Sequence, residues 1–272
     1  MKKLPGKIAI VTGAGSGMGE AITKRLCSLG ATVIATDINE SGLQSALGNI
    51  SDAGQIVCRY QDVTDEEAFF ELVKSTAKEY GRLDYIFNNA GIAIAGEVKN
   101  NTMDDWKKTI DINQMGVIYG TLAAYEVMRN QGYGHIVNTA SVAGLVPAPM
   151  LTAYSMTKHA VLGLTLALRE EAKAYGVNLN VVCPGIVKTN IVQPDRLRDF
   201  DLGNDPFDFV QQKAKIKAIS ADEAAEFIVK GVARNDAEII FPLHGRMFVR
   251  SYRNLRRAWE GMTALSLRVM RN

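Results

Sequence analysis

A glycine-rich turn near the amino terminus constrains the fold of this chain most strongly. Thr12-Gly-Ala-Gly-Ser-Gly-Met-Gly19 follows the apolar run 7–11 and opens a helix-length stretch at 17–29. Glycines here permit a tight turn and let the backbone approach a diphosphate, which the amino end of the helix attracts. A purely structural glycine turn is the alternative. The strand before and the helix after favour dinucleotide binding.

The rest of the chain repeats this alternation of apolar, β-branched runs and amphipathic, helix-length stretches. The predicted strands are 7–11, 32–36, 55–60, 85–88, 134–139, 178–182 and 238–241, and the predicted helices include 17–29, 65–80, 103–131 and 153–175. Near-continuous apolar strands such as Ile8-Ala-Ile-Val11 indicate burial on both faces. We therefore expect an α/β protein with one doubly wound parallel sheet of about seven strands, a Rossmann fold, in a single domain at 1–245.

Composition adds further limits. The 272 residues are 47% hydrophobic, which is enough for a full core, and the net charge of +2 argues against a nucleic-acid partner. No apolar run approaches the roughly 20 residues of a membrane-spanning helix. Residues 1–6 lead directly into a strand, so we expect a cytoplasmic protein without a signal peptide. The three cysteines and three histidines are scattered, which predicts neither disulfides nor a metal site.

Asp37 predicts the choice of cofactor. It ends the second predicted strand, 18 residues after Gly19, where an acid accepts ribose hydroxyls. A carboxylate there also repels a 2′-phosphate, and positions 16 and 38–40 carry no basic residue. An ordinary turn or helix-capping carboxylate is the alternative. NAD is the expected cofactor, with NADP(H) as the runner-up.

Tyr154 and Lys158 stand four residues apart in a predicted helix, 13 residues after Ser141. The spacing puts phenol and ammonium on one face, where the cation is expected to pull the pKa of the tyrosine below its usual ~10. A tyrosine tuned in this way exchanges a proton with an alcohol or a carbonyl. A long helix also offers such a pair by chance, so the interpretation depends on the motifs around it.

Several separated motifs occur in a fixed order. They are Thr12 to Gly19, Asp62-Val63, Asn88-Asn-Ala-Gly91, Asp111-Ile-Asn113, Ser141, Tyr154-x-x-x-Lys158, and Pro184-Gly185 followed by Thr189. With these motifs, residues 1–245 of the chain resemble the short-chain dehydrogenase/reductase family, in the branch with a Thr-Gly-x-x-x-Gly-x-Gly turn.

The resemblance implies a catalytic group of Asn113, Ser141, Tyr154 and Lys158. In it, Tyr154 is the general acid or base, and Lys158 assists it and also holds the nicotinamide ribose. Ser141 hydrogen-bonds the substrate oxygen, and a kinked carbonyl at Asn113 holds a water that relays protons. Taken alone, Ser141 could be a strand-end cap and Asn113 a satisfied core amide.

The implied cofactor contacts come from the turn, from strand ends, from the catalytic helix and from the segment after the sixth strand. They are Gly13, Gly15, Ser16, Gly17, Met18, Gly19, Asp37, Ile38, Asp62, Val63, Asn89, Ala90, Gly91, Tyr154, Lys158, Pro184, Gly185, Ile186 and Thr189.

Apolar residues predict the kind of substrate. The apolar segment 145–151 and a long irregular region at about 186–219 favour a mostly hydrophobic substrate with one secondary hydroxyl or carbonyl group. The predicted substrate contacts are Ser141, Val142, Met150, Tyr154, Val187 and Ile191, and the irregular region adds Phe200, Phe207 and Phe209. The alternative is that some of these residues only pack the loop. The same region contains Lys188, Arg196 and Arg198, without a clear anion site.

The last residues, 246–272, form a basic extension. Seven arginines and one glutamate follow Gly245, and apolar residues recur at helical spacing. These are Phe248, Tyr252, Leu255, Trp259, Met262 and Val269. Either the helix packs on its own core or on a partner subunit, or it makes peripheral contact with an anionic membrane. Relatives often end in a glycine-rich segment that joins a tetramer, so both a homodimer and a homotetramer stay open.

The sequence thus predicts an NAD-dependent oxidoreductase of the alcohol dehydrogenase type, which interconverts a secondary alcohol and a ketone. An NADP(H)-dependent carbonyl reductase is one alternative. A non-catalytic NAD-binding regulatory or scaffold protein is another, which the complete catalytic group disfavours.

Overall fold

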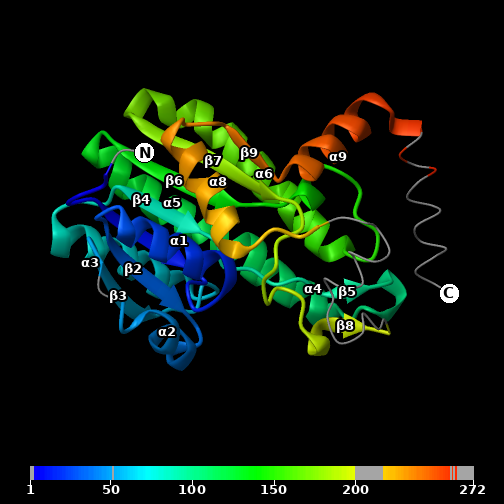
Figure 1. Cartoon of the computed structure of the whole chain (residues 1–272), viewed down its shortest axis with the longest axis horizontal. Helices are drawn as coiled ribbons and strands as arrows, with labels where there is room; N and C mark the ends of the chain where they lie inside the picture. Colours follow the sequence, from blue (N-terminus) through cyan, green and yellow to red (C-terminus); the bar gives the residue numbers. More distant parts are fainter. Residues whose placement is uncertain (1–2, 51, 200–216, 258, 260, 262–272) are drawn as a thin grey trace.

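The computed structural model describes residues 3–50, 52–199, 217–257, 259 and 261, with a large sheet at its centre (Figure 1). Seven parallel strands follow the order β3-β2-β1-β4-β6-β7-β9. They are β1 (Ile8–Thr12), β2 (Thr32–Asp37), β3 (Gln55–Tyr60), β4 (Tyr85–Asn88), β6 (Gly134–Thr139), β7 (Val177–Pro184) and β9 (Glu238–Phe241). The chain adds strands outward from β1 on one side and from β4 on the other. This confirms the doubly wound fold, in which ligands bind beyond the carboxyl ends of the strands.

Helices cover both faces of the sheet (Figure 1). α1 (Gly17–Ser28), α2 (Glu40–Leu47) and α8 (Ala221–Ala233) bury apolar residues against one face. α3 (Glu66–Tyr80), α5 (Gly116–Gln131) and α6 (Thr152–Ala172) pack on the other. The remaining helical segments among the described residues are α4 (Met103–Ile110), α9 (Leu243–Asn254), η1 (Val98–Asn100), η2 (Asp111–Met115), η3 (Val142–Gly144), η4 (Lys173–Tyr175) and η5 (Pro194–Arg196). In the described parts of the chain, no helix has the length and apolar character needed to span a membrane.

The first strand shows why the sheet needs two layers of helices. Ala9 and Val11 belong to the core cluster beneath α1 and α8, whereas Ile8 and Ile10 belong to the cluster beneath α3 and α5. Successive residues of a strand point to opposite faces, so a strand that is apolar at every position must be covered on both sides. All five residues of β1 are buried, in agreement with the prediction from its unbroken apolar run.

The predicted helix 103–131 is interrupted. A π-helical turn, η2 (Asp111–Met115), joins α4 to α5, and Asn113 within it is fully buried. A π turn widens the helix by one residue and changes the direction of its carbonyl groups. Apolar periodicity does not reveal a single extra residue, so the sequence predicted one continuous helix.

A second, two-stranded sheet joins β5 (Ala95–Gly96) to β8 (Leu197–Arg198), and the sequence did not predict it. Arg198 belongs to β8, and its guanidinium donates hydrogen bonds of 2.6 and 3.0 Å to the carboxylate of Asp105. These bonds hold the pKa of Asp105 at about 2. The segment after β7 is thereby attached to α4. Strands of two residues have no periodic pattern that could predict them. Phe200, Phe207 and Phe209 lie outside the described residues.

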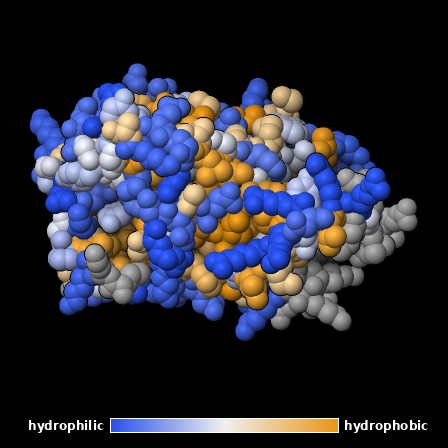
Figure 2. Space-filling model, turned by 90° about the horizontal axis from the view of Figure 1, so that it is seen from above, coloured by the Kyte–Doolittle hydropathy of each residue, from blue (hydrophilic) through white to orange (hydrophobic). Residues whose placement is uncertain are grey.

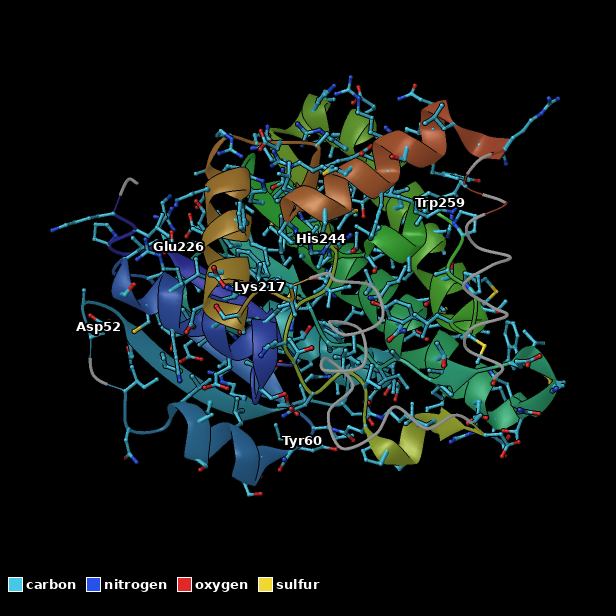
Figure 3. The ribbon with its side chains drawn as sticks, turned by 45° about the vertical axis from the view of Figure 1, so that its right-hand side comes forward. Asp52, Tyr60, Lys217, Glu226, His244 and Trp259 are labelled. Atoms are coloured by element: carbon cyan, nitrogen blue, oxygen red, sulfur yellow. The ribbon has the colours of Figure 1, made fainter. Side chains whose placement is uncertain are left out.

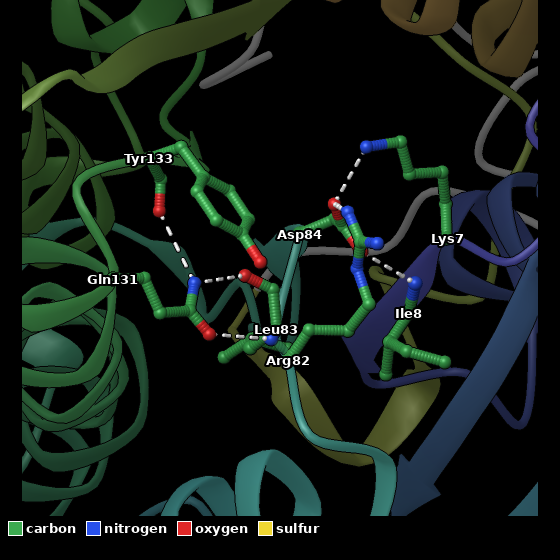
Figure 4. Close-up of polar contacts among 7 residues, drawn as sticks. All are labelled: Lys7, Ile8, Arg82, Leu83, Asp84, Gln131 and Tyr133. Atoms are coloured by element: carbon green, nitrogen blue, oxygen red, sulfur yellow. Dashed lines mark hydrogen bonds and ion pairs between the residues drawn. The ribbon is translucent and has the colours of Figure 1, made fainter.

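The amino-terminal edge of the sheet carries a dense polar network (Figure 4). Asp84, only 4% exposed, accepts hydrogen bonds from Nζ of Lys7 at 2.8 Å and from the guanidinium of Arg82 at 2.6 and 2.7 Å. The N–H of Ile8 donates a further bond at 3.0 Å. Burial by itself raises the pKa of Asp84, but these donors outweigh it, and the pKa lies below its usual value.

Helix α9 packs against the main domain (Figure 3). Val249 and Trp259 are buried in one core cluster. The ring centroid of Trp259 lies 5.7 Å from that of Phe248 and 6.0 Å from that of Tyr252. This part of the predicted apolar stripe faces the core, which favours the packed-helix alternative for it. Met262 and Val269 lie outside the described residues.

Candidate active site

The glycine-rich turn between β1 and α1 lies against the loop after β4. Gly13 and Gly17 have φ angles of 65° and 56°, a region that L side chains rarely adopt. A Cβ on Gly13 would lie 2.8 Å from Cα of Ala90, and one on Gly19 would lie 2.1 Å from the carbonyl oxygen of Gly13. The turn has no room for side chains at these positions.

The amino end of α1 is open to a ligand. Ser16 precedes the helix with extended backbone, and its side chain makes no capping hydrogen bond. Helix N–H groups without a side-chain cap attract anions, and the helix dipole adds to this attraction. Above the turn, the side chain of Thr189 lies 3.1 Å from where a Cβ on Gly17 would be. These residues fit a diphosphate that is bound mainly by backbone groups.

Thr12 joins the ends of β1 and β4. Its Oγ1 accepts hydrogen bonds from the N–H groups of Asn89 and Ala90 at 3.0 and 3.1 Å, and its carbonyl oxygen accepts one from Nδ2 of Asn89 at 3.1 Å. Oδ1 of Asn89 is buried without a hydrogen-bond partner among the described residues. Such an acceptor suits a ligand hydroxyl, as the implied ribose contact requires.

Asp37, at the end of β2, is oriented by its neighbours. Oδ2 accepts a hydrogen bond from the N–H of Gly15, and Oδ1 accepts one from the N–H of Asn39, both at 2.9 Å. A carboxylate fixed in this way can accept two ribose hydroxyls, and it repels a phosphate on either of them.

A cleft of about 430 Å³ collects most of the predicted cofactor residues. Those that line it are Gly13, Ser16, Gly17, Met18, Asp37, Ile38, Asp62, Val63, Asn89, Ala90, Gly91 and Thr189. The structure adds Asn39, Gln61, Ile92, Lys108, Ile112, Asn190, Ile191, Gln193 and Arg196. The predicted cofactor residues Gly15, Gly19, Tyr154, Lys158, Pro184, Gly185 and Ile186 do not line it.

Packing explains several of these differences. Gly15 and Gly19 face other parts of the protein, Asp37 and Gly13 respectively. Gly185 lies against α9, because a Cβ there would be 2.9 Å from Nε2 of His244. The same nitrogen accepts a hydrogen bond from the N–H of Ile186 at 3.3 Å. His244 stands near the start of α9 (Figure 3), so this helix supports the segment after β7.

Tyr154 and Lys158 lie together on α6, as the i,i+4 spacing predicted. Nζ of Lys158 is 5.5 Å from the ring centroid of Tyr154 and donates a hydrogen bond of 2.7 Å to the carbonyl oxygen of Thr139. Ser141, which follows β6, lies close enough to Tyr154 to affect its pKa. Lys158 adjoins the cleft, because a Cβ on Gly91 would lie 3.5 Å from its Nζ.

Burial dominates the electrostatics of this group. It raises the pKa of Tyr154 to about 12, although the neighbouring Ser141 acts in the opposite direction. It also lowers the pKa of Lys158 to about 8. The sequence predicted a lowered pKa for Tyr154, and for the protein without a bound cofactor this prediction is wrong. Both side chains are almost completely buried, so their lost hydration outweighs the attraction between them.

Asn113 connects the π turn to the loop after β4. Its Oδ1 accepts a hydrogen bond from the N–H of Ile92, and its Nδ2 donates one to the carbonyl oxygen of Ile92, both at 2.8 Å. Nδ2 also lies 3.4 Å from Oγ1 of Thr157 on α6. The side chain is a satisfied core amide, so a proton relay at this position would have to use the backbone carbonyl.

An apolar wall adjoins Tyr154. Ala93 and Ala143 are buried against it, and this cluster is extended by Ala148, Leu151, Ile191 and Val192. Ile191 also lines the cofactor cleft, so the wall continues from the cleft to the tyrosine.

Other predicted substrate contacts lie elsewhere. Val142 packs in the cluster of α9, and Val187 lies in the core beneath α8, where it pairs with Ile219. This packing favours the loop-packing alternative for these two residues. Met150 has a φ of 67°, and its carbonyl oxygen accepts a hydrogen bond from the N–H of Gly96 at 2.8 Å.

Lys108 and Arg196 are the charged cleft residues that the sequence did not assign to the site. Lys108 stands four residues before Ile112, which also lines the cleft, so helical periodicity could have placed it. Arg196 depends on η5 and on the β5–β8 sheet, neither of which has a sequence signal.

Comparison with known proteins identifies the family of this chain. The family described as short chain dehydrogenase matches residues 7–199. The chain is 38% identical over 192 residues to an uncharacterised oxidoreductase of Staphylococcus aureus, a match that covers 70% of this chain and 82% of the relative. It is 33% identical over 250 residues to the oxidoreductase SadH of Mycobacterium tuberculosis, a match that covers 90% of each chain.

Two solved structures share the fold. A short-chain dehydrogenase/reductase of Burkholderia phymatum in complex with NAD has a TM-score of 0.80 at 26% identity and covers 95% of this chain and 97% of that chain. Levodione reductase has a TM-score of 0.73 at 27% identity and covers 87% and 95%. The family match, the relatives and the fold agree, and this chain belongs to the short-chain dehydrogenase/reductase family of oxidoreductases.

Proposed function

We propose that the protein oxidises a secondary alcohol, or reduces the corresponding ketone, with NAD as its cofactor. One observation carries the proposal: the buried Tyr154 lies beside Lys158, with Ser141 close enough to affect its pKa, next to a cleft that fits a dinucleotide. When bound, NAD supplies the hydride acceptor or donor. The protein supplies orientation and the movement of a proton.

Tyr154 is the proton-transfer residue in this proposal. With a raised pKa it keeps its proton at neutral pH and can donate it to a carbonyl oxygen during reduction. During oxidation it must accept a proton from the alcohol. It must therefore first lose its own proton to solvent. Lys158, with a pKa of about 8, is still largely protonated at pH 7, and its charge, together with that of bound NAD⁺, would favour the phenolate. Ser141 hydrogen-bonds the substrate oxygen and stabilises the charge that develops there.

The cofactor assignment rests on Asp37, and fluorescence titration with NADH and NADPH tests it. We expect much tighter binding of NADH, and a smaller difference between the two cofactors in Asp37→Ala, because the repulsion of the 2′-phosphate is removed. Asp222→Asn, on the exposed start of α8, serves as a control and should keep the preference. Equal affinities in the unmutated protein would contradict NAD specificity, and tighter binding of NADPH would favour an NADP(H)-dependent carbonyl reductase.

The apolar wall beside Tyr154 supports a mostly hydrophobic substrate. The test is oxidation of a panel of sterols, acyl alcohols, terpenoid alcohols and polyols, followed as the appearance of NADH. Turnover of the apolar secondary alcohols, with little turnover of the polyols, is the expected result. NADH binding without turnover of any alcohol or ketone would instead favour a non-catalytic NAD-binding regulatory or scaffold protein.

We also expect the enzyme to form a homodimer or homotetramer. Figure 2 shows a face on which hydrophobic residues form a central area bordered by hydrophilic ones. Large apolar side chains are exposed on α5, α6 and α9, namely Leu122, Met156, Leu243 and Met247. Assembly would cover surfaces of this kind. Light scattering of the purified protein distinguishes the two states from a monomer.

Peripheral membrane contact through the basic extension remains a second proposal for the location of the protein. The exposed side of α9 carries Arg246, Arg250 and Arg253, which favour anionic lipid. Sedimentation with anionic and neutral vesicles at low and high salt tests it. Binding to anionic vesicles that weakens as salt rises is expected. If the full chain does not sediment with anionic vesicles at low salt, the extension acts only in packing.

A further inference from the structure

The cofactor cleft is lined by two carboxylates and two cations. Asp37 accepts hydrogen bonds from the N–H groups of Gly15 and Asn39, and Asp62 accepts them from the N–H and hydroxyl of Thr64. Lys108 comes from α4 and Arg196 from η5. Among the residues described by the structure, neither cation is paired with an acid. The two positive charges at the cleft are therefore available to a ligand.

Arg196 has most of its hydrogen-bonding capacity unused. Its Nε is buried and has no partner in the described part of the chain, and Nη1 reaches the carbonyl oxygen of Ile191 only at 3.5 Å. Arg198, two residues later, donates two bonds to Asp105 and two more to backbone carbonyl groups. A guanidinium has five N–H donors, and a buried donor without a partner is costly to keep.

The position of Arg196 is fixed at two points. On one side, the pairing of Arg198 with Asp105 attaches the segment to α4. On the other side, the side chain of Thr189 contacts the glycine turn at Gly17. Arg196 thus lies in a segment that is attached to α4 at one end and lies over the glycine-rich turn at the other, and its side chain lines the cleft between them.

We propose that Arg196 is an anion-binding residue of this cleft, which donates hydrogen bonds to the diphosphate of the bound dinucleotide. Lys108 adds positive charge at the same cleft. The inference rests on the dinucleotide binding proposed above. The end of a helix presents only about half a positive charge, whereas a diphosphate carries two negative charges. A planar guanidinium supplies a full charge and paired donors that match phosphate oxygens.

Calorimetric titration of the full-length protein with NADH, ADP-ribose and adenosine tests the proposal. NADH and ADP-ribose contain the diphosphate, whereas adenosine does not. In Arg196→Gln we expect the affinities for NADH and ADP-ribose to fall about tenfold or more, with the adenosine affinity unchanged. The affinity for NADH should also depend less steeply on salt. Lys108→Gln should produce the same pattern with a smaller loss.

Control variants separate charge from loop structure. Arg234→Gln, whose side chain pairs with Asp236 on the surface, removes one positive charge away from the cleft and should change none of the three affinities. Arg196→Lys should recover part of the lost affinity, because it restores the charge. Unchanged affinities for NADH and ADP-ribose in Arg196→Gln would overturn the proposal, and so would an equal loss for adenosine, which would indicate a disordered loop. If the unmutated protein bound neither NADH nor NADPH, the proposed function itself would fail.

Discussion

Two groups of buried polar residues, at opposite edges of the central sheet, differ in how completely the protein satisfies their hydrogen bonds. At the amino-terminal edge, Asp84 accepts four hydrogen bonds. The side-chain amide of Gln131 forms hydrogen bonds with both the N–H and the carbonyl oxygen of Leu83. At the carboxyl-terminal edge, the buried Lys158 donates to a single carbonyl group. Oδ1 of Asn89 and Nε of Arg196 are buried there with no hydrogen-bond partner among the described residues.

This difference separates residues that stabilise the fold from residues that are available to a ligand. A polar group that is satisfied inside the protein contributes to stability but cannot bind anything else. A buried group without a partner costs free energy until a ligand meets it. Changes at the amino-terminal edge should therefore affect unfolding, and changes at the carboxyl-terminal edge should affect chemistry and binding.

The largest effect is expected for Tyr154→Phe. The variant removes the proton-transfer hydroxyl and keeps the ring, so turnover should fall by about 10² to 10⁴. NADH affinity and melting temperature should stay close to those of the unmutated protein. Steady-state rates on a verified substrate and an NADH titration measure the two properties. Near-normal turnover would show that another group transfers the proton.

Asp84→Ala should instead lower stability and leave turnover unchanged. It leaves the N–H of Ile8 and the guanidinium of Arg82 without their acceptor and should lower the free energy of unfolding by about 2–3 kcal/mol. Turnover should be unchanged at temperatures where the protein is folded. Urea unfolding and rate measurements on the same sample check both. Lost activity in fully folded Asp84→Ala would mean that the two edges are coupled.

The pH dependence of stability extends this prediction. The pKa of Asp84 is lower in the folded state than its ordinary value, so its contribution is complete at neutral pH and is lost as the pH falls through the folded-state pKa. Asp84→Asn should therefore lose less stability than the unmutated protein between neutral and acidic pH. Parallel unfolding curves for the two proteins would contradict this assignment.

Lys158→Met is expected to change the free energy of unfolding by less than Asp84→Ala does, and in the opposite direction. The pKa of Lys158 falls from 10.5 to about 8 on folding, so burial of the charged form costs stability below about pH 8. That cost is relieved between about pH 8 and 10.5, where the unfolded chain binds more protons than the folded protein. At pH 7 the variant should be more stable by on the order of 1 kcal/mol, although it is inactive. Thermal melts at pH 7 and 10 test this, because the advantage should shrink at the higher pH.

The sequence predicted the fold well where a strand is buried on both faces and reads as an apolar run, as β1 does. Strands 55–60 and 134–139 contain polar residues, and they were also placed with their observed ends. Features that depend on contacts distant in the sequence were not predictable. Ala95–Gly96 pairs with Leu197–Arg198 only because the segment after β7 returns to α4.

At the site, the sequence identified which residue types meet but not how burial changes them. Tyr154 and Lys158 were paired correctly on one helix, but the direction of the tyrosine pKa shift was wrong, because spacing says nothing about hydration. Arg196 shows the same limit. Its place in the cleft depends on the three-dimensional path of an irregular segment, which has no periodic pattern to read.

The double hydrogen bond between Asn113 and Ile92 affects how mutants of this enzyme should be interpreted. The amide replaces the partner that a neighbouring strand would offer, with one donor and one acceptor facing the same backbone residue. Neither Asp nor Leu can do both, so either substitution would move the loop that carries Asn89 and Gly91. Inactivity of an Asn113 variant would thus be a confounded result, consistent with a lost proton relay and equally with a displaced ribose site. Only a variant whose cofactor affinity stays intact could distinguish these two causes.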